Sequence, residues 1–184
     1  MSSTAESTKT RMSWDDFLAA GAEWQRWELV DGEVEFMSPA GKKHGAVIAN
    51  LITALGAYCR DHREWIVFAS ETAFTMASGS WRCPDAALVR AERFPNREIA
   101  DGPADFPPDL AFEVYSPADT ASQIARKRKD YQESGVIRVW IDPKNRMAEL
   151  IEPGRPTKYF LDGEVLVIEN LADFALVLKT LFEV

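Results

Sequence analysis

The sequence predicts an α/β fold with a mixed sheet, in which a helix, three strands, a second helix and a fourth strand follow one another from residue 44. Two observations carry this prediction. Apolar residues recur at helical spacing over 44–62 and again over 119–134, whereas runs rich in β-branched and aromatic residues lie between and after them. Alternating segments before and after this core predict an N-terminal β-hairpin and a C-terminal antiparallel extension.

The length and composition limit what the chain can be. With 184 residues it can bury one sizeable core, so we expect a single domain over 13–184 that follows a mobile tail at 1–12. No apolar run approaches the ~18 residues of a membrane span, and the first residues lack the apolar segment of a signal peptide. A cytoplasmic protein without membrane contact is therefore expected. Because the formal net charge is -8, any contact with nucleic acid has to be local and basic.

The N-terminal part of the domain carries two local signals. Residues 13–21 are typical of a short helix, since Ser13 can cap its start and Gly21 can end it. Over 26–37, two alternating runs meet at Asp31-Gly32, a dipeptide typical of a two-residue hairpin turn.

The first half of the core is a helix followed by two strands. The helix over 44–62 carries one apolar stripe, made of Val47, Ile48, Leu51, Ile52, Leu55 and Tyr58. Strand formers over 65–76 predict a strand region that bends or breaks near Ser70. A second strand is expected over 84–89, because proline is tolerated at a strand's first position. The proline-rich residues 90–108 are expected to form a long loop, of a length that is often functional.

The third strand, expected over 109–116, places Glu113 inside a continuous apolar run. An ionised carboxylate there is costly unless it is paired, neutralised or bound to a metal. Asp85 begins the preceding strand, so the two carboxylates can converge on a hard divalent cation if these strands are neighbours. The alternative is that Glu113 pairs with an arginine such as Arg82 or Arg138.

The second helix, expected over 119–134, begins with a Thr120-x-x-Gln123 capping box and ends before Gly135. Lys127 and Arg128 lie at the two edges of its apolar stripe, and periodicity does not choose which of them leans inward. Three other polar residues of this helix are expected to point away from the stripe: Arg126, Lys129 and Asp130.

The remaining sequence predicts a fourth core strand and the C-terminal extension. The core strand covers 136–141 and ends at Asp142-Pro143. Three antiparallel strands are expected over 147–151, 158–161 and 165–168. The apolar segment 174–182 is expected to pack back on the core.

Several spaced motifs occur in a fixed order along the chain. They are Trp27-Glu-Leu-Val-Asp-Gly-Glu33, His44-Gly45, Pro84-Asp85, Pro108-Asp-Leu-Ala-Phe-Glu-Val-Tyr-Ser-Pro117, Lys127-x-x-x-Tyr131, Gly135-Val136 and Val139-Trp-Ile-Asp-Pro143. This set resembles the Uma-type restriction endonuclease family, which belongs to the PD-(D/E)xK nuclease superfamily. Several motifs in the right order are much more specific than any one of them.

The resemblance implies a restriction-endonuclease-like core of order αβββαβ, with Asp85 and Glu113 as ligands of Mg²⁺ or Mn²⁺. It also implies that Glu28 is an additional acid at or near the metal. The superfamily's usual lysine lies two residues after the glutamate, where this sequence has Tyr115. In the resembled family the lysine lies on the following helix, and Lys127 matches that position.

The expected function is metal-dependent hydrolysis of phosphodiester bonds by an endodeoxyribonuclease. The expected catalytic residues are Asp85, Glu113, Lys127 and Glu28, with the three acids as metal ligands. Contacts with DNA are expected from His44, Lys42, Lys43 and Arg128, and a homodimer is a further expectation. The alternative is a nuclease-fold binding or interaction module that cleaves nothing, which the acidic net charge and the missing strand lysine favour.

Overall fold

The computed structural model describes residues 16, 19, 27–37 and 41–183. Of the helix expected over 13–21, the two described residues, Asp16 and Ala19, are helical. The rest of that helix and the tail expected over 1–12 lie outside the described residues. Within the described ranges, no helix is long and apolar enough to cross a membrane.

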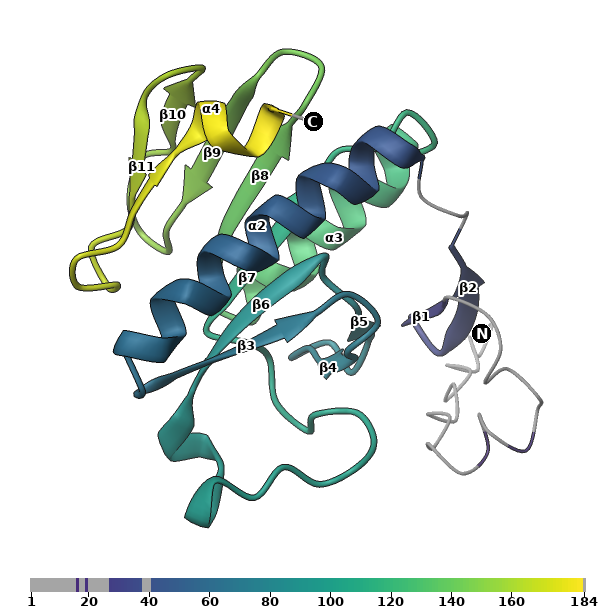
Figure 1. Cartoon of the computed structure of the whole chain (residues 1–184). Coiled ribbons are helices and arrows are strands. Elements are labelled where there is room, and N and C mark those ends of the chain that lie inside the picture. The colour runs from purple at the N-terminus through teal and green to yellow at the C-terminus, as the bar shows by residue number, and fades with distance from the viewer. Residues whose placement is uncertain (1–15, 17–18, 20–26, 38–40, 184) are drawn as a thin grey trace.

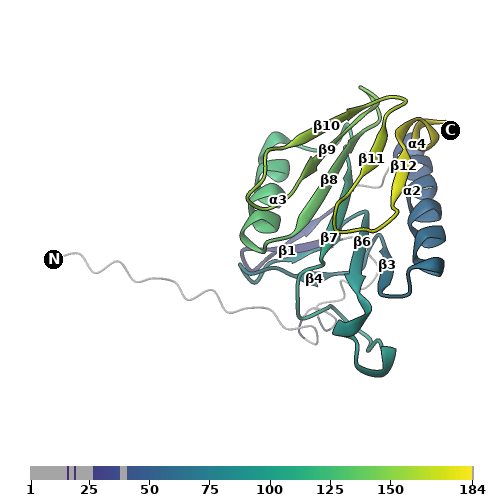
Figure 2. The ribbon, with the colours of Figure 1, turned by 90° about the vertical axis from the view of Figure 1, so that its left-hand side faces the viewer.

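The main sheet is mixed and lies between two helices, α2 (Lys42–Asp61) and α3 (Ala121–Glu133). Figures 1 and 2 show α2 on one face of the sheet and α3 on the other. The strands are β3 (Trp65–Ala69), β6 (Ala86–Arg90), β7 (Leu110–Val114), β8 (Ile137–Asp142), β9 (Met147–Ile151) and β10 (Lys158–Leu161). They are arranged in the order β10-β9-β8-β7-β6-β3, and only β7 and β8 are a parallel pair.

The order predicted from residue 44 is confirmed, because α2, β3, β6, β7, α3 and β8 form an αβββαβ core. A parallel pair of strands needs a crossover connection, and α3 supplies it between β7 and β8. The crossover therefore lays α3 over the strand that contains Glu113.

Side chains alternate across β7, which explains how a carboxylate fits in a buried strand. Leu110, Phe112 and Val114 pack in the larger apolar cluster, on the α2 side of the sheet. Ala111 packs in the smaller cluster together with Tyr131 of α3. Glu113 alternates with Phe112 and Val114, so its side chain lies on the α3 side.

A second, smaller sheet borders the core. It contains β1 (Trp27–Val30), β2 (Glu33–Phe36), β4 (Phe74–Thr75) and β5 (Trp81–Arg82) in the order β2-β1-β5-β4. The predicted hairpin is confirmed, since Asp31 and Gly32 form its turn with φ angles of 51° and 83°. Leu29 pairs with Trp81, so the hairpin is joined to the short strand that carries Arg82.

The strand region over 65–76 breaks near Ser70, as predicted: it forms two strands in different sheets, because the chain turns at Glu71, whose φ is 77°. The strand expected from residue 84 begins at Ala86, since the carboxylate of Asp85, rather than its backbone, bonds to β7. The two-residue strand β5 was not predicted, because it is too short to show a period.

The second helix and the C-terminal extension follow the predictions closely. Both hydrogen bonds of the Thr120–Gln123 capping box are present, and Gly135 follows the helix with a φ of 69°. β9 and β10 extend the main sheet, whereas β11 (Val165–Val167) and β12 (Ala175–Val177) pair separately. These two strands and α4 (Leu178–Phe182) contribute to the larger apolar cluster. The predicted loop over 90–108 contains two short 3-10 helices, η1 (Ala91–Arg93) and η2 (Pro95–Arg97).

Candidate functional site

Asp85 immediately precedes β6, and Glu113 lies in β7, the antiparallel neighbour of β6. Ala86 pairs with Phe112, so Asp85 lies next to the end of β7 that carries Glu113. The backbone N–H of Val114 donates a 2.8 Å hydrogen bond to Asp85 Oδ2, which fixes that carboxylate against β7. The exposed fractions of Asp85 and Glu113 are 6% and 5%. The structure therefore brings the two predicted acids together.

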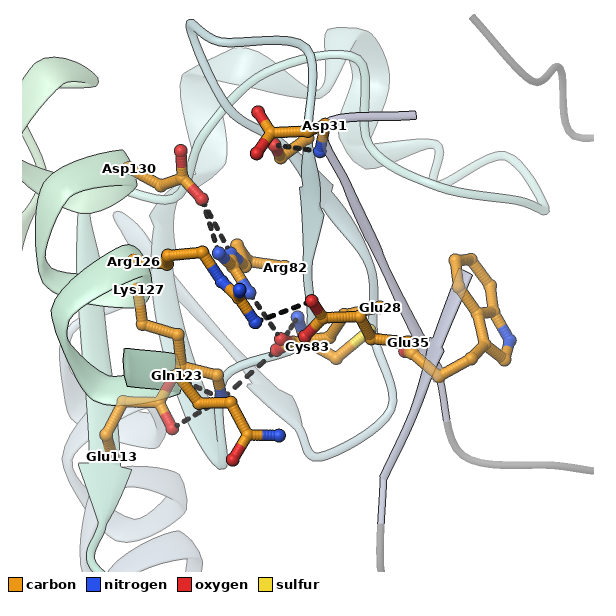
Figure 3. Close-up of polar contacts among 12 residues, drawn as sticks. Glu28, Asp31, Glu35, Arg82, Cys83, Glu113, Gln123, Arg126, Lys127 and Asp130 are labelled. Carbon is orange, nitrogen blue, oxygen red and sulfur yellow. Dashed lines mark hydrogen bonds and ion pairs between the residues drawn. The ribbon is translucent and has the colours of Figure 1, made fainter. Parts of the chain in front are cut away.

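Lys127 joins two of the predicted acids. Its Nζ lies 3.2 Å from each carboxylate oxygen of Glu113 and 3.1 Å from Glu28 Oε1 (Figure 3). Arg128, the other residue at the edge of the helix stripe, instead donates to Tyr115 Oη at 2.6 Å and to Glu149 Oε2 at 2.7 Å. The side chain of Lys127, and not that of Arg128, therefore points toward the acids. The periodicity of the helix alone did not decide between these two residues.

Glu28 reaches the site from the hairpin rather than from the main sheet. Its Oε2 accepts a 2.7 Å hydrogen bond from Arg82 Nη1, and its Oε1 accepts one of 3.2 Å from the backbone of Cys83. Because Glu28 also pairs with Lys127, its carboxylate links the hairpin to α3. Glu28 is only 2% exposed, so its charge depends on these partners.

Arg82 and Asp130 complete the network; the sequence offered Arg82 only as a possible partner of Glu113, and it did not indicate Asp130. Arg82 Nε donates to Asp130 Oδ2 at 2.8 Å (Figure 3). The guanidinium is almost fully buried. Asp130 was expected to point away from the packed face, and this expectation was wrong because Arg82 draws it inward. The spacing Lys127, Asp130, Tyr131 is the signal that could have found it, since residues three and four apart share a helix face.

Tyr131 contacts Glu113 directly. Its hydroxyl donates a 2.7 Å hydrogen bond to Glu113 Oε1, within the buried core. The alternative in which an arginine such as Arg82 or Arg138 pairs with Glu113 was wrong, because the partners of Glu113 are Lys127 and Tyr131. Arg138 Nη1 donates instead to the backbone oxygen of Val136.

His44, in the first turn of α2, lies next to Asp85. Its Nε2 is 2.8 Å from the backbone oxygen of Val114 and 3.4 Å from Asp85 Oδ2. Because a carbonyl oxygen can only accept, Nε2 carries a proton in this arrangement. The hydrogen bond with Asp85 raises the pKa of His44, although burial opposes this shift.

The electrostatics distinguish Glu113 from Glu28. Burial raises the pKa of Glu113 to about 7, against the lowering effect of Lys127, and the nearby charges of Asp85 and Glu28 add to the rise. Burial also acts on Glu28, but Lys127 and Arg82 outweigh it and lower the pKa of that carboxyl. The same carboxylates raise the pKa of Lys127, despite its burial. Of these two glutamates, Glu113 is therefore the one whose charge the protein stabilises less.

The donor set fits a hard divalent cation. Two carboxylates, from Asp85 and Glu113, and the backbone oxygen of Val114 lie together, and magnesium takes such oxygen ligands along with several waters. The network also holds four carboxylates against the two permanent cations Arg82 and Lys127. A divalent ion would offset that excess of negative charge. Among the described residues, no three His, Cys, Asp or Glu side chains form a ready metal cluster.

The site opens into a cleft of about 810 Å³, counting the open solvent at its mouth. Its inner wall carries Glu28, Arg82, Asp85, Glu113 and Lys127. The other lining residues come from the hairpin, from the start of α2, from β8 and from residues 114–124; they are Glu35, Met37, His44, Val114, Ser116, Ala118, Asp119, Gln123, Ile124 and Trp140.

Of the four residues expected to contact DNA, only His44 lines this cleft. Lys42 is exposed in the first turn of α2. Lys43 Nζ donates to the backbone oxygen of Pro143 at 3.0 Å. Arg128 is held by Tyr115 and Glu149, and its guanidinium lies over the ring of Trp140 at 4.9 Å from the centroid.

Comparisons with known proteins bear on the fold and the family of this chain. Among solved structures, the chain is similar to "a putative nuclease belonging to DUF820 from Anabaena variabilis ATCC 29413", with a TM-score of 0.79 and 21% identity over 91% of this chain and 96% of that chain. At this identity the likeness shows a shared fold. No curated protein matches the chain. Residues 14–179 match the family described as "Uma2: Putative restriction endonuclease", which supports a nuclease-like function. The chain therefore belongs to the Uma2 restriction endonuclease family.

Proposed function

We propose that this chain is a metal-dependent nuclease that hydrolyses phosphodiester bonds of DNA. The observation that carries the proposal is the position of Lys127, whose Nζ lies 3.2 Å from both oxygens of Glu113 in the cleft that Asp85 also lines. Two carboxylates and one ammonium group at the same end of two strands are the groups that metal-assisted hydrolysis of a phosphodiester needs.

Each residue has a separate role in the proposal. Asp85 and Glu113 would hold Mg²⁺ or Mn²⁺, which when bound lowers the pKa of a water and neutralises charge on the phosphate. Lys127 would stabilise the additional negative charge of the transition state as a point charge. Glu28 keeps the ammonium of Lys127 in place through their 3.1 Å ion pair. DNA as substrate, the identity of the ion and a homodimeric assembly remain predictions.

Cleavage of DNA by the purified protein tests the proposal. Supercoiled and single-stranded DNA are incubated with Mg²⁺, Mn²⁺ or EDTA, and the wild type is compared with Asp85→Asn and Glu113→Gln. We expect metal-dependent cleavage that both substitutions abolish. The matched control is Glu149→Gln, a carboxylate on the same face of the sheet that does not line the cleft. Cleavage that persists in EDTA, or in both acid variants, would contradict the proposal.

A binding module that cleaves nothing is the second candidate, and one observation favours it. Lys127 already pairs with Glu28 and Glu113, so both of these buried acids have a cation partner without a metal. In such a module the network would serve stability alone.

Thermal unfolding separates the two candidates. A cation that binds only the native state stabilises it, by about 2.7 kcal/mol at a hundredfold excess over Kd. We expect Mn²⁺ to raise the Tm of the wild type and to leave the Tm of Asp85→Asn nearly unchanged. Calorimetry in Na⁺ at matched ionic strength controls for general ionic effects. Equal Tm shifts in the wild type and Asp85→Asn would favour the binding module.

The metal affinity is expected to depend on pH through Glu113. Because burial raises the pKa of this carboxyl to about 7, a proton competes with the metal at lower pH. We expect the affinity for Mn²⁺ to rise about tenfold per pH unit up to that pKa and then to level off. The stability of the metal-free protein is expected to change with pH in the opposite direction to the metal affinity. Because the folded state holds the proton of Glu113 more tightly than the unfolded state does, the free energy of unfolding falls as pH rises from about 4.5 to about 7.

Titration calorimetry over this pH range measures the affinity. The control is Glu113→Gln, which has no proton to lose and is expected to bind weakly with a flatter pH profile. A wild-type affinity that does not change below neutral pH would show that Glu113 is charged throughout or does not bind the ion.

A further inference from the structure

Two ion pairs connect the N-terminal hairpin to α3 beside the cleft. The inner pair, between Glu28 and Lys127, is buried, with side chains 2% and 12% exposed. The outer pair joins Glu35 Oε1 of β2 to Arg126 Nη2 of α3 at 2.6 Å, with side chains 30% and 41% exposed (Figure 3). Glu35 lines the cleft, as do Gln123 and Lys127 of the same helix. The outer pair therefore lies at the rim of the cleft, where solvent and ligands reach it.

Glu35 is an unfavourable residue at this position for two reasons. It lies directly opposite Glu28 in the hairpin, and like charges directly opposite each other destabilise a pair of strands. Its carboxylate also repels the phosphodiester group that the proposed function requires in the cleft. What Glu35 contributes among the described contacts is its bond to Arg126. The role of Glu35 therefore depends on what Arg126 does.

Arg126 uses only part of its hydrogen-bonding capacity. Its Nη2 donates to one oxygen of Glu35, whereas its Nε is buried and has no hydrogen-bond partner among the described residues. Nε and Nη2 form one edge of a guanidinium, and elsewhere in this chain Arg146 uses both to hold the two carboxylate oxygens of Asp162, each at 2.9 Å. A buried donor without an acceptor costs free energy. This edge of Arg126 is therefore an incomplete site for an anion that offers two oxygens.

The backbone of a nucleic acid supplies such anions at regular intervals. Each phosphate carries a negative charge and offers oxygens to which arginine can donate two parallel hydrogen bonds. The start of α2 adds positive charge next to the lining residue His44, because Lys42 is exposed and Lys43 Nζ donates to the neutral backbone oxygen of Pro143. A backbone that reaches the acids can therefore meet cations from α2 and from α3.

We propose that Arg126 binds a backbone phosphate of the DNA that enters the cleft, and that Glu35 occupies this phosphate site in the free protein. The proposal rests on the proposed nuclease function, whose substrate-binding surface it extends. The incoming phosphate accepts hydrogen bonds from Nε and Nη2 of Arg126 together, and the carboxylate of Glu35 moves into solvent. This exchange costs little, because an exposed ion pair contributes little to stability. Glu35 is therefore a competitor that weakens the binding of DNA.

Binding of DNA in the absence of cleavage tests the proposal. A short fluorescent duplex is titrated with the full chain in EDTA at several salt concentrations, and anisotropy gives the Kd. We expect Glu35→Gln to bind about fivefold more tightly than the wild type, because its amide no longer competes for Arg126. The matched control is Glu149→Gln, which removes a similar ion pair of 2.7 Å from Arg128 of α3, outside the cleft. That variant is expected to bind within about twofold of the wild type.

Two results of this titration would overturn the proposal. In the first, Glu35→Gln binds no more tightly than the wild type, or neither protein binds the duplex. In the second, Glu149→Gln gains as much affinity as Glu35→Gln, so the gain reflects net charge alone.

A second pair of variants identifies the phosphate contact itself. Arg126→Met loses one phosphate contact, so we expect weaker binding and a slope of log Kd against log salt concentration that is smaller by about 1. Arg128→Met changes the net charge equally and is expected to keep the wild-type slope, because its guanidinium binds Tyr115 and Glu149. Circular dichroism confirms that both variants are folded. A wild-type slope in Arg126→Met overturns the proposal.

Cleavage in Mn²⁺ separates this proposal from the nuclease function. If Asp85→Asn abolishes a metal-dependent cleavage while Glu35→Gln and Arg126→Met bind DNA as the wild type does, the phosphate site is wrong and the nuclease function stands. If no DNA is cut while both variants change the binding of DNA as expected, the nuclease function fails and the phosphate site stands.

Discussion

Replacement of Lys127 by methionine is expected to lower the rate of DNA cleavage by about 10²–10³-fold, the usual loss when one preorganised charge-stabilising group is removed from an active site. The ammonium lies 3.2 Å from both oxygens of Glu113 and 3.1 Å from Glu28, so no other cation of the described chain can replace it there without rearrangement. Methionine has a similar length, and Glu28 keeps its ion pair with Arg82, so the fold is expected to persist. Single-turnover cleavage in Mn²⁺ measures the effect.

The affinity for Mn²⁺ distinguishes a catalytic role of Lys127 from a structural one. Without the ammonium, one positive charge fewer competes for Glu113, so Lys127→Met is expected to bind Mn²⁺ at least as tightly as the wild type. The matched control is Arg128→Met, one residue further along α3, whose guanidinium binds Tyr115 and Glu149 outside the cleft. That variant is expected to cleave within a few fold of the wild type. If Lys127→Met cleaves as fast as the control, Lys127 takes no part in the reaction.

Much of the fold could be predicted from the sequence because its signals are local. The Asp31-Gly32 turn, the capping box of α3 and the apolar stripe of α2 each depend on a few neighbouring residues, and all are present. The strand β5 could not be predicted in this way. Two residues show no period, and Trp81 and Arg82 become a strand only because β1 and β4 lie on either side of them.

The site residues show the same difference between local signals, which could be predicted, and tertiary contacts, which could not. Asp85 and Glu113 were predicted to lie together because a carboxylate in an apolar strand is itself a signal. Asp130 was missed, since on α3 it has the appearance of a solvent-facing charge. Its burial depends on Arg82, which comes from a different sheet and is 48 residues away in sequence. Partnerships of this kind depend on the tertiary arrangement, and helix periodicity alone assigned Asp130 to the wrong face.

Arg82→Met is expected to destabilise the protein by about 3–5 kcal/mol, the usual cost of removing one partner from a buried ion pair. Arg82 is 1% exposed and holds two acids at once, with Nη1 2.7 Å from Glu28 Oε2 and Nη2 2.6 Å from Asp130 Oδ2. Without the guanidinium, Asp130 loses its cation partner in the described chain, and Glu28 keeps Lys127. Urea denaturation at neutral pH measures the free energy of unfolding.

Two further variants show whether unpaired charge causes this loss. In the triple variant Arg82→Met, Glu28→Gln and Asp130→Asn, the two carboxylates that Arg82 held are neutral amides, so most of the lost stability is expected to return. Arg146→Met breaks an exposed pair with Asp162 and is expected to leave the urea midpoint nearly unchanged. If the triple variant is no more stable than Arg82→Met, the loss arises from the packing of the arginine side chain. Side-chain packing, and not charge pairing, would then hold the acids of the cleft in place. Glu28 would not need Arg82 to remain charged beside Lys127.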